Sequence, residues 1–200
     1  MKIEERERVD VVVSEKDFER FSGILGNEGF SLLKEADEFA LTYRGGFVCF
    51  QKMVESLPVS VDLLVGMVQS RQTDAAYSFD YLWKNSEIRE VTGFGVKASA
   101  EARVVDREML MALKINSMRM ADQRDIISLC AGEVDTGKVA NHLTRVSGEK
   151  IKEHVGSLLS LLEEQKSRDT LKGVFVFSDS VLDGLLNRAR ATLAEIDTKL

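Results

Sequence analysis

Apolar and polar residues alternate over short distances in the first half of the chain, a pattern typical of β-strands. Val9–Val13 is short and rich in β-branched residues, which predicts a buried strand, and residues 57–66 alternate strictly enough to predict another. Residues 38–53 form two apolar arms around a Gly-Gly pair, which predicts a hairpin. Residues 89–105 predict one or two further strands.

Helical spacing interrupts this pattern directly after the first strand. Ser14 is the predicted N-cap, with Asp17 three residues later as its capping partner, and the helix is expected to end at Gly29. The apolar positions that fall on one helical stripe are Phe18, Phe21, Ile24 and Leu25. Residues 67–86 are predicted to be a loop that contains one helical turn.

From Asp106, a predicted N-cap, the period becomes helical and stays so to the end of the chain. The helices are expected within residues 106–118, 122–130, 137–146, 148–167 and 180–200. The helix expected within residues 148–167 has one apolar stripe, which would pack into the core or bind a partner helix. The stripe consists of Ile151, Val155, Leu158, Leu159 and Leu162. The predicted fold class is therefore α+β: a mixed β-sheet with flanking helices in residues 1–105, followed by a helical subdomain in residues 106–200.

Composition is that of an ordinary globular protein, with 44% hydrophobic and 30% charged residues among 200. No apolar run approaches the roughly 18 residues of a membrane span, and the charged first ten residues are unlike a signal peptide. Cys49 and Cys130 stand in apolar surroundings, which favours buried, reduced thiols and a cytoplasmic location. The net charge of −6 argues against a protein whose main role is to coat nucleic acid.

Residues 113–129 gather charge within an apolar helical pattern. On a continuous helix, Asp122 and Asp125 fall about 80° and about 20° from Lys114, with Arg119 at about 140°, so the first three share a face. If the helix instead breaks near residue 120, Asp122 becomes an N-cap and Asp125 its capping partner. The two cations are not needed for such a cap, which leaves an exposed or salt-bridged surface as their plainest role.

The segment "MLMALKINSMRMADQRDIISL" resembles the helical motif of the abortive-infection-type nucleotidyltransferases, the minimal, toxin-like branch of the DNA polymerase β superfamily. That motif has a Lys, an Arg five residues on, Asp residues eight and eleven on, an Ile and a Leu. The matching positions here are Lys114, Arg119, Asp122, Asp125, Ile126 and Leu129. Upstream, "VDVVVSEKDFERFSGILGNEGF" and "VSVDLLVG" are similar to the two strands that carry the family's metal-binding aspartates, so the resemblance covers residues 5–130.

This resemblance implies Mg²⁺-dependent transfer of a nucleotide from an NTP to an acceptor hydroxyl on RNA, protein or a small molecule. Asp10 and Asp62 would be the metal ligands, because two Mg²⁺ ions require hard carboxylate oxygens on rigid neighbouring strands. Together with Lys114 they would form the catalytic set. Lys114 and Arg119 would bind the triphosphate, with Asp122 and Asp125 orienting these cations; Asp122 and Asp125 thus complete the nucleotide-binding set.

Two departures from the family pattern bear on activity. The family has a pair of aspartates separated by one residue; Asp10 matches the second, but Arg8 stands in the place of the first. The family also has an upstream helix and a glycine turn that grip the phosphates. These elements would precede Met1, so we expect them to be missing from this sequence. Loss of a metal ligand and insertion of a cation would cripple a two-metal site.

Three hypotheses follow from these residues. The first is a nucleotidyltransferase, with activity impaired by the departures, and the second is a non-catalytic relative that binds a nucleotide or a protein partner. The third is a helical scaffold centred on residues 138–200, which would form a homodimer through its C-terminal helices. Separately, Trp83 with Phe79 and Tyr81 is expected either to stack on a base or to pack locally.

Overall fold

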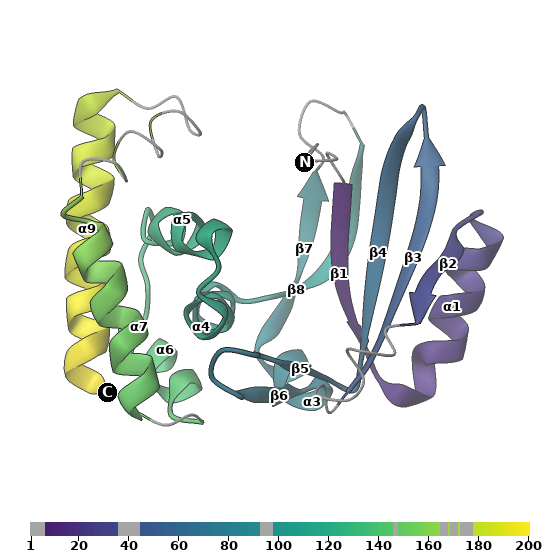
Figure 1. Cartoon of the computed structure of the whole chain (residues 1–200), viewed down its shortest axis with the longest axis horizontal. Coiled ribbons are helices and arrows are strands. Elements are labelled where there is room, and N and C mark those ends of the chain that lie inside the picture. The colour runs from purple at the N-terminus through teal and green to yellow at the C-terminus, as the bar shows by residue number, and fades with distance from the viewer. Residues whose placement is uncertain are drawn as a thin grey trace. The chain divides into compact units, whose positions relative to one another are not determined.

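The structure is a computed structural model and divides into two compact units, each described by itself (Figure 1). The residues it describes are 7–35, 45–92, 98–145, 148–164, 168, 172 and 178–200. The first unit comprises Met1–Gln69 and Ala76–Leu82, and the second Ser70–Ala75 and Trp83–Leu200. This division differs from the boundary expected at residue 105, because residues 83–105 belong with the helical unit.

Strands dominate the first unit and helices the second. The first unit contains β1 (Glu7–Val13), the 3₁₀ turn η1 (Glu15–Asp17), α1 (Phe18–Asn27), β2 (Ser31–Glu35), β3 (Gly46–Val54), β4 (Leu57–Val65), β5 (Met67–Gln69) and β6 (Ala76–Ser78). Helix α3 (Phe79–Lys84) runs across the boundary between the units. The second unit contains β7 (Ser86–Thr92), β8 (Ser99–Val105), α4 (Arg107–Ser117), α5 (Met120–Leu129), α6 (Thr136–Leu143), α7 (Gly148–Leu161) and α9 (Asp179–Lys199).

A mixed sheet with strand order β1-β4-β3-β2 forms the body of the first unit (Figure 1). Strand β1 runs parallel to β4, and the other neighbours are antiparallel. Its apolar face buries Val13, Phe50 and Leu63, and Phe18 and Leu25 of α1 pack against them. Burial of this face is what selects the register, since a slip of one residue would turn these side chains to the opposite face. The mixed sheet with a flanking helix confirms the α+β class.

The predicted strands are present, with differences at the edges of the sheet. Strand β1 was expected to be buried, and only its C-terminal end is: Val13 is 1% exposed but Val9 is 55% exposed, and among the described residues β4 is the one strand that pairs with β1. Strand β3 confirms the second arm of the predicted hairpin. The first arm lies within residues 36–44, outside the described residues, and β3 pairs with β2, a strand that the sequence pattern did not predict.

Helix α1 begins later than expected. Ser14 does not cap it: its hydroxyl donates to Asp17 Oδ2 at 2.5 Å, and the turn η1 precedes the first α-helical residue. The helix ends at Asn27, and Gly29 follows with φ of +81°, which confirms glycine as the stop signal. Two positions of the predicted stripe remain exposed, namely Phe21 and Ile24.

Residues 67–86 contain more structure than the predicted loop. The expected helical turn is α3, but β5 and β6 also pair as an antiparallel two-stranded sheet. Gly66 enters this segment with φ of +79°, a conformation that L side chains rarely adopt.

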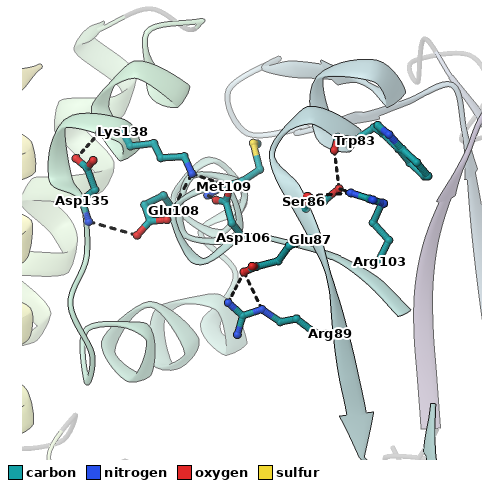
Figure 2. A network of polar contacts seen from close by, with 10 residues as sticks. All are labelled: Trp83, Ser86, Glu87, Arg89, Arg103, Asp106, Glu108, Met109, Asp135 and Lys138. Carbon is teal, nitrogen blue, oxygen red and sulfur yellow. Dashed lines mark hydrogen bonds and ion pairs between the residues drawn. The ribbon is translucent and has the colours of Figure 1, made fainter. Parts of the chain in front are cut away.

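The second unit packs its helices around one apolar core. Asp106 caps α4 as predicted, since its carboxylate accepts a hydrogen bond from the amide of Met109 at 2.9 Å. In Figure 2, Lys138 of α6 reaches Asp106 at 2.7 Å and Glu108 at 3.8 Å, which ties the first turn of α6 to that of α4. The apolar stripe of α7 lies in this core, with Ile151, Val155, Leu158 and Leu162 buried.

No helix in the described part of the chain is both long and apolar enough to cross a membrane.

Candidate functional site

The two carboxylates predicted to hold metal lie side by side on the first unit's sheet. Asp10 of β1 and Asp62 of β4 are directly paired in the parallel register, so their side chains project from the same face. This face is opposite the one covered by α1, because Val11 and Leu63, the next register pair, pack into the apolar core. Asp62 is only 2% exposed, whereas the side chain of Asp10 is 50% exposed.

Arg8 joins these two carboxylates. It lies two residues before Asp10 on β1 and therefore projects from the same face. Its Nε donates to Asp10 Oδ1 at 2.8 Å, and its Nη2 contacts Asp62 Oδ2 at 2.6 Å. A fork-shaped guanidinium is suited to bridge two carboxylates in this way, and arginine keeps its charge in proteins. Arg8 is thus the counter-ion of both Asp10 and Asp62.

This donor set does not fit the two Mg²⁺ ions that the resemblance implies. Each of the two carboxylates already has one oxygen bound by a guanidinium nitrogen, and a cation between them would meet the positive charge of Arg8. Mg²⁺ prefers several oxygen ligands in octahedral geometry, whereas Arg8 supplies a cation where a third carboxylate is needed. Over the described residues, no three His, Cys, Asp or Glu side chains are grouped so that they could hold a metal ion.

The predicted nucleotide-binding residues form a second cluster, in the helical unit. Lys114 Nζ donates to Asp125 Oδ2 at 2.6 Å and to Asp122 Oδ1 at 3.1 Å. Arg119 Nε donates to Asp122 Oδ2 at 2.8 Å. The side chain of Asp122 is 2% exposed, against 22% for Lys114 and 65% for Arg119. The two cations and the two carboxylates form ion pairs with one another, so the net charge of the cluster is zero.

The cluster forms because the helix breaks, and not because one continuous helix aligns its faces. Met118, with φ of +49°, ends α4, and α5 starts at Met120. Arg119 is the N-cap of α5, and Asp122 at N3 accepts its backbone N–H at 3.1 Å. Of the two alternatives, the broken helix is thus the one observed, but its N-cap is Arg119, three residues before Asp122. Lys114 from the last turn of α4 then reaches both carboxylates of α5.

The pKa values in this cluster follow from these contacts. Burial raises the pKa of Asp122, but hydrogen bonds from Arg119, Ser117 and Lys114 outweigh it and hold the pKa at about 2, below the usual 3.8. Burial likewise lowers the pKa of Lys114, and its hydrogen bonds to Asp125 and Asp122 outweigh this and leave the pKa raised. Both groups are thus held in their charged forms, as a stable ion pair between helices requires.

Asp10 and Asp62 belong to the first unit, and Lys114, Arg119, Asp122 and Asp125 to the second. The structure brings the residues together within each set: the two carboxylates around Arg8, and the four charges around Lys114. In both sets every charge is bound by an opposite charge of the same set.

Sequence reasoning missed the polar residues that close the C-terminal end of α4. Asn116, 1% exposed, accepts from Thr73 Oγ1 at its side-chain oxygen and from Ser70 Oγ at its carbonyl, at 2.6 and 2.8 Å. His154 Nδ1 donates to the carbonyl of Ile115 at 2.7 Å. An asparagine inside an apolar helical run was the available signal, but its partners lie some 40 residues away in sequence.

The cysteines and the buried histidine do not add a reactive centre. Burial raises the pKa of Cys130 to about 11, despite a hydrogen bond from Thr192 and the nearby charge of Arg107. Burial also lowers the pKa of His142. Cys49 is half-buried and not fully buried as expected, and both cysteines are free thiols. A thiol that stays protonated is a poor nucleophile, so Cys130 acts as a core residue.

No family model matches this chain, and no curated protein or solved structure matches it either.

Proposed function

We propose that this chain is a non-catalytic, nucleotidyltransferase-like protein that binds a nucleotide without transferring it. The observation that carries the proposal is the bridge from Arg8 to Asp10 and Asp62. Nucleotidyl transfer by the family's chemistry needs these carboxylates free for metal ions, and here an arginine of the same strand engages them.

Arg8 also supplies a reason to expect a phosphate ligand. The side chain is 51% exposed, and its contacts with Asp10 and Asp62 use Nε and Nη2. A guanidinium has five N–H donors, and among the described residues those on Nη1 are left to reach a phosphate oxygen from a side chain that the two carboxylates already orient. Nucleotide binding at this arginine would need no Mg²⁺.

The Lys114 cluster supports a structural role in place of triphosphate binding. Its ammonium is engaged by Asp122 and Asp125, one helix away, at 3.1 and 2.6 Å. Lys114 is 22% exposed and these carboxylates occupy two of its three N–H donors, so it is less available to a triphosphate than Arg8, which is 51% exposed and has more donors. We therefore propose that Lys114 holds α4 against α5.

The second candidate is an impaired Mg²⁺-dependent nucleotidyltransferase. What favours it is the register pairing of Asp10 with Asp62, because neighbouring carboxylates on adjacent strands are the arrangement that two-metal transfer uses. Arg8 is half-exposed, so its side chain has room to rotate away from the pair. This candidate predicts NTP turnover that depends on Mg²⁺.

The deciding experiment is thermal melting with each of the four NTPs, with Mg²⁺ and with a chelator. A ligand at about 100 times its Kd stabilises the folded state by roughly 2.7 kcal/mol, which gives a clear shift in Tm. The proposal predicts a shift that persists in the chelator and disappears in R8A. Arg190→Ala removes an exposed arginine paired with Glu163 and serves as the matched control, with its shift unchanged.

A second variant separates the two candidates. Arg8→Asp removes the bridging cation and adds a carboxylate at the position where the family has one, so Mg²⁺ should stabilise R8D but not the unmodified chain. Mg²⁺-dependent stabilisation of the unmodified chain by an NTP, or release of pyrophosphate from it, would reject the non-catalytic proposal. No shift with any nucleotide would reject nucleotide binding.

A further inference from the structure

The β7–β8 ribbon of the second unit is exposed to an unusual degree for a regular element. All residues of β7 after Ser86 are exposed, and β8 is exposed from Ser99 to Arg103. Ile88 is 63% exposed and Val91 is 47% exposed. A two-stranded ribbon that is open on both faces is marginally stable by itself, so additional strands would stabilise it.

The outer edge of β7 lacks several of the features that protect a strand edge, although three of its residues are charged, namely Glu87, Arg89 and Glu90. It has no proline or lysine, and its pairing with β8 runs from Ser86 to Thr92 without a bulge. In the described part of the chain, β8 is the single strand paired with it. Such an edge is a template on which another strand can pair through backbone hydrogen bonds.

The charges on β7 identify which strand fits. When two copies of a strand pair antiparallel about a twofold axis, opposite residues share a face, so the axis passes through a residue. An axis through Glu87, Arg89 or Glu90 would place like charges directly opposite each other, which destabilises a sheet. Of the other four positions, Ser86 and Thr92 are the ends of the strand, where an axis would leave most of β7 unpaired, so Ile88 and Val91 are the remaining internal centres.

An axis through Ile88 makes the strand complementary to itself. Ile88 then lies opposite Ile88 of the second copy, and Glu87 lies opposite Arg89 of the second copy on both sides of the axis. Within one chain Glu87 and Arg89 already pair, with Arg89 Nε 2.9 Å from Glu87 Oε1 (Figure 2), so both side chains lie on one face and are ready to exchange partners. An axis through Val91 offers no opposite charges among the described residues.

Strand β8 is a poorer edge for the same purpose. Its self-complementary register would need Arg103, which Trp83 and Ser86 hold: Arg103 Cζ lies 4.1 Å from the centroid of the indole, and Nη1 donates to the carbonyl of Ser86 at 3.0 Å (Figure 2). Val104 and Val105 are half-buried, which shortens the accessible edge.

We propose that the β7 edge, centred on Ile88, is a self-association surface that binds a second copy of this chain and forms a continuous four-stranded sheet. This surface is separate from the C-terminal helices from which a homodimer was expected; the core-facing residues of α9 are buried in their own unit, among them Leu182, Leu186 and Leu193. The edge is short, so we expect a weak, transient dimer with a dissociation constant on the order of micromolar.

The test is sedimentation equilibrium of the full chain over about 1–300 μM, a range that brackets a micromolar dimer. Glu87→Arg and Arg89→Glu each place like charges opposite each other twice per dimer, so each should raise the dissociation constant about tenfold or more. An equal mixture of E87R and R89E chains should associate again as a heterodimer, because each charge then faces its opposite. The double variant E87R/R89E should also recover the dimer.

Two controls use the same type of charge change. Glu90→Arg lies on the same strand but faces Ser86 of the second copy in this register, so dimerisation should be unchanged. Glu101→Arg alters β8 and should also leave it unchanged. The proposal is overturned if the chain is monomeric throughout the range. It is equally overturned if E101R weakens the dimer while E87R does not, or if the E87R and R89E mixture stays monomeric while the unmodified chain dimerises.

Discussion

Arg8 and Asp62 form an ion pair of 2.6 Å between neighbouring parallel strands, with one partner half-exposed and the other 2% exposed. A buried carboxylate is costly unless a charge or hydrogen-bond donor satisfies it. Arg8 meets this need in the folded chain. Its role in the fold and its effect on the candidate metal site are thus two results of the same contact.

Removing this counter-ion should destabilise the chain through Asp62. Arg8→Ala leaves a buried carboxylate without its partner and should lower the free energy of unfolding by about 1–3 kcal/mol, measured by urea denaturation. In the Asp62→Asn background the same change should cost less, because a neutral amide does not need the cation. The Arg190→Ala control breaks the exposed pair with Glu163 and should change stability by less than about 1 kcal/mol. Equal losses for R8A with and without D62N would show that Arg8 does not act through Asp62.

The Asp122 carboxylate should make stability depend on pH at the acid end. Its pKa is about 2 in the folded chain against the usual 3.8, so between these values the unfolded chain binds more protons. The contribution of Asp122 to the free energy of unfolding, about 2 kcal/mol in all, is therefore complete well above pH 3.8. It is lost as the pH falls through the folded-state pKa of about 2. Urea unfolding across this range should show the slope in the unmodified chain.

Asp122→Asn should remove that part of the slope, and Asp125→Asn is the matched control. Asp125 also contacts Lys114, but its side chain is 46% exposed. The D125N slope should therefore resemble that of the unmodified chain. If D122N retains the full acid slope, the carboxylate responsible lies elsewhere.

The sequence pattern was sufficient for elements whose apolar period is long or strict. Strand β4 and the helices α4 and α9 follow from alternation or from helical spacing, and Asp106 was found as an N-cap because its signal is local. The short strands β5 and β6, of three residues each, carry too few positions to show a period. The edge position of β1 could not be read either, since exposure depends on which strand pairs beside it.

The sequence identified the candidate residues themselves, but it did not predict which side chains they contact. The sequence marked Arg8 as a cation out of place; its contact with Asp62 depends on the register between β1 and β4, which local sequence does not specify. The break between α4 and α5 has no glycine or proline to signal it. Met118 adopts the left-handed conformation without such a signal, and this turn decides which carboxylates Lys114 reaches.

The buried hydroxyl of Thr73 should be required for the stability of the second unit. It donates to Asn116 Oδ1 at 2.6 Å, and both side chains are at most 4% exposed. Thr73→Val keeps the shape but removes the donor, so Asn116 loses a partner and the free energy of unfolding should fall by about 1–3 kcal/mol. Thr73→Ser keeps the hydroxyl and loses one methyl, which should cost about 1 kcal/mol or less. Equal losses in T73V and T73S would assign the effect to packing.

The contact between Arg103 and Trp83 can be followed by fluorescence, because Trp83 is the one tryptophan of the 200-residue sequence. The guanidinium covers one face of an indole that is 52% exposed, and Ser86 links the two by accepting from Arg103 and donating to the carbonyl of Trp83 at 2.7 Å. Arg103→Met should expose the ring further to water and shift its emission to longer wavelength. The loss of the cation–π contact should cost about 0.5–1 kcal/mol, as is usual at exposed sites.

A matched change separates this contact from a general effect of charge on the ribbon. Arg89→Met removes an arginine of the neighbouring strand whose guanidinium pairs with Glu87 (Figure 2). Its emission should match that of the unmodified chain when both are measured well below the micromolar range, where self-association does not contribute. The same red shift in R89M as in R103M would mean that the ribbon as a whole, and not the guanidinium above the ring, sets the environment of Trp83. A shift in R103M alone would assign the environment of the indole to the Arg103 guanidinium that lies over its ring.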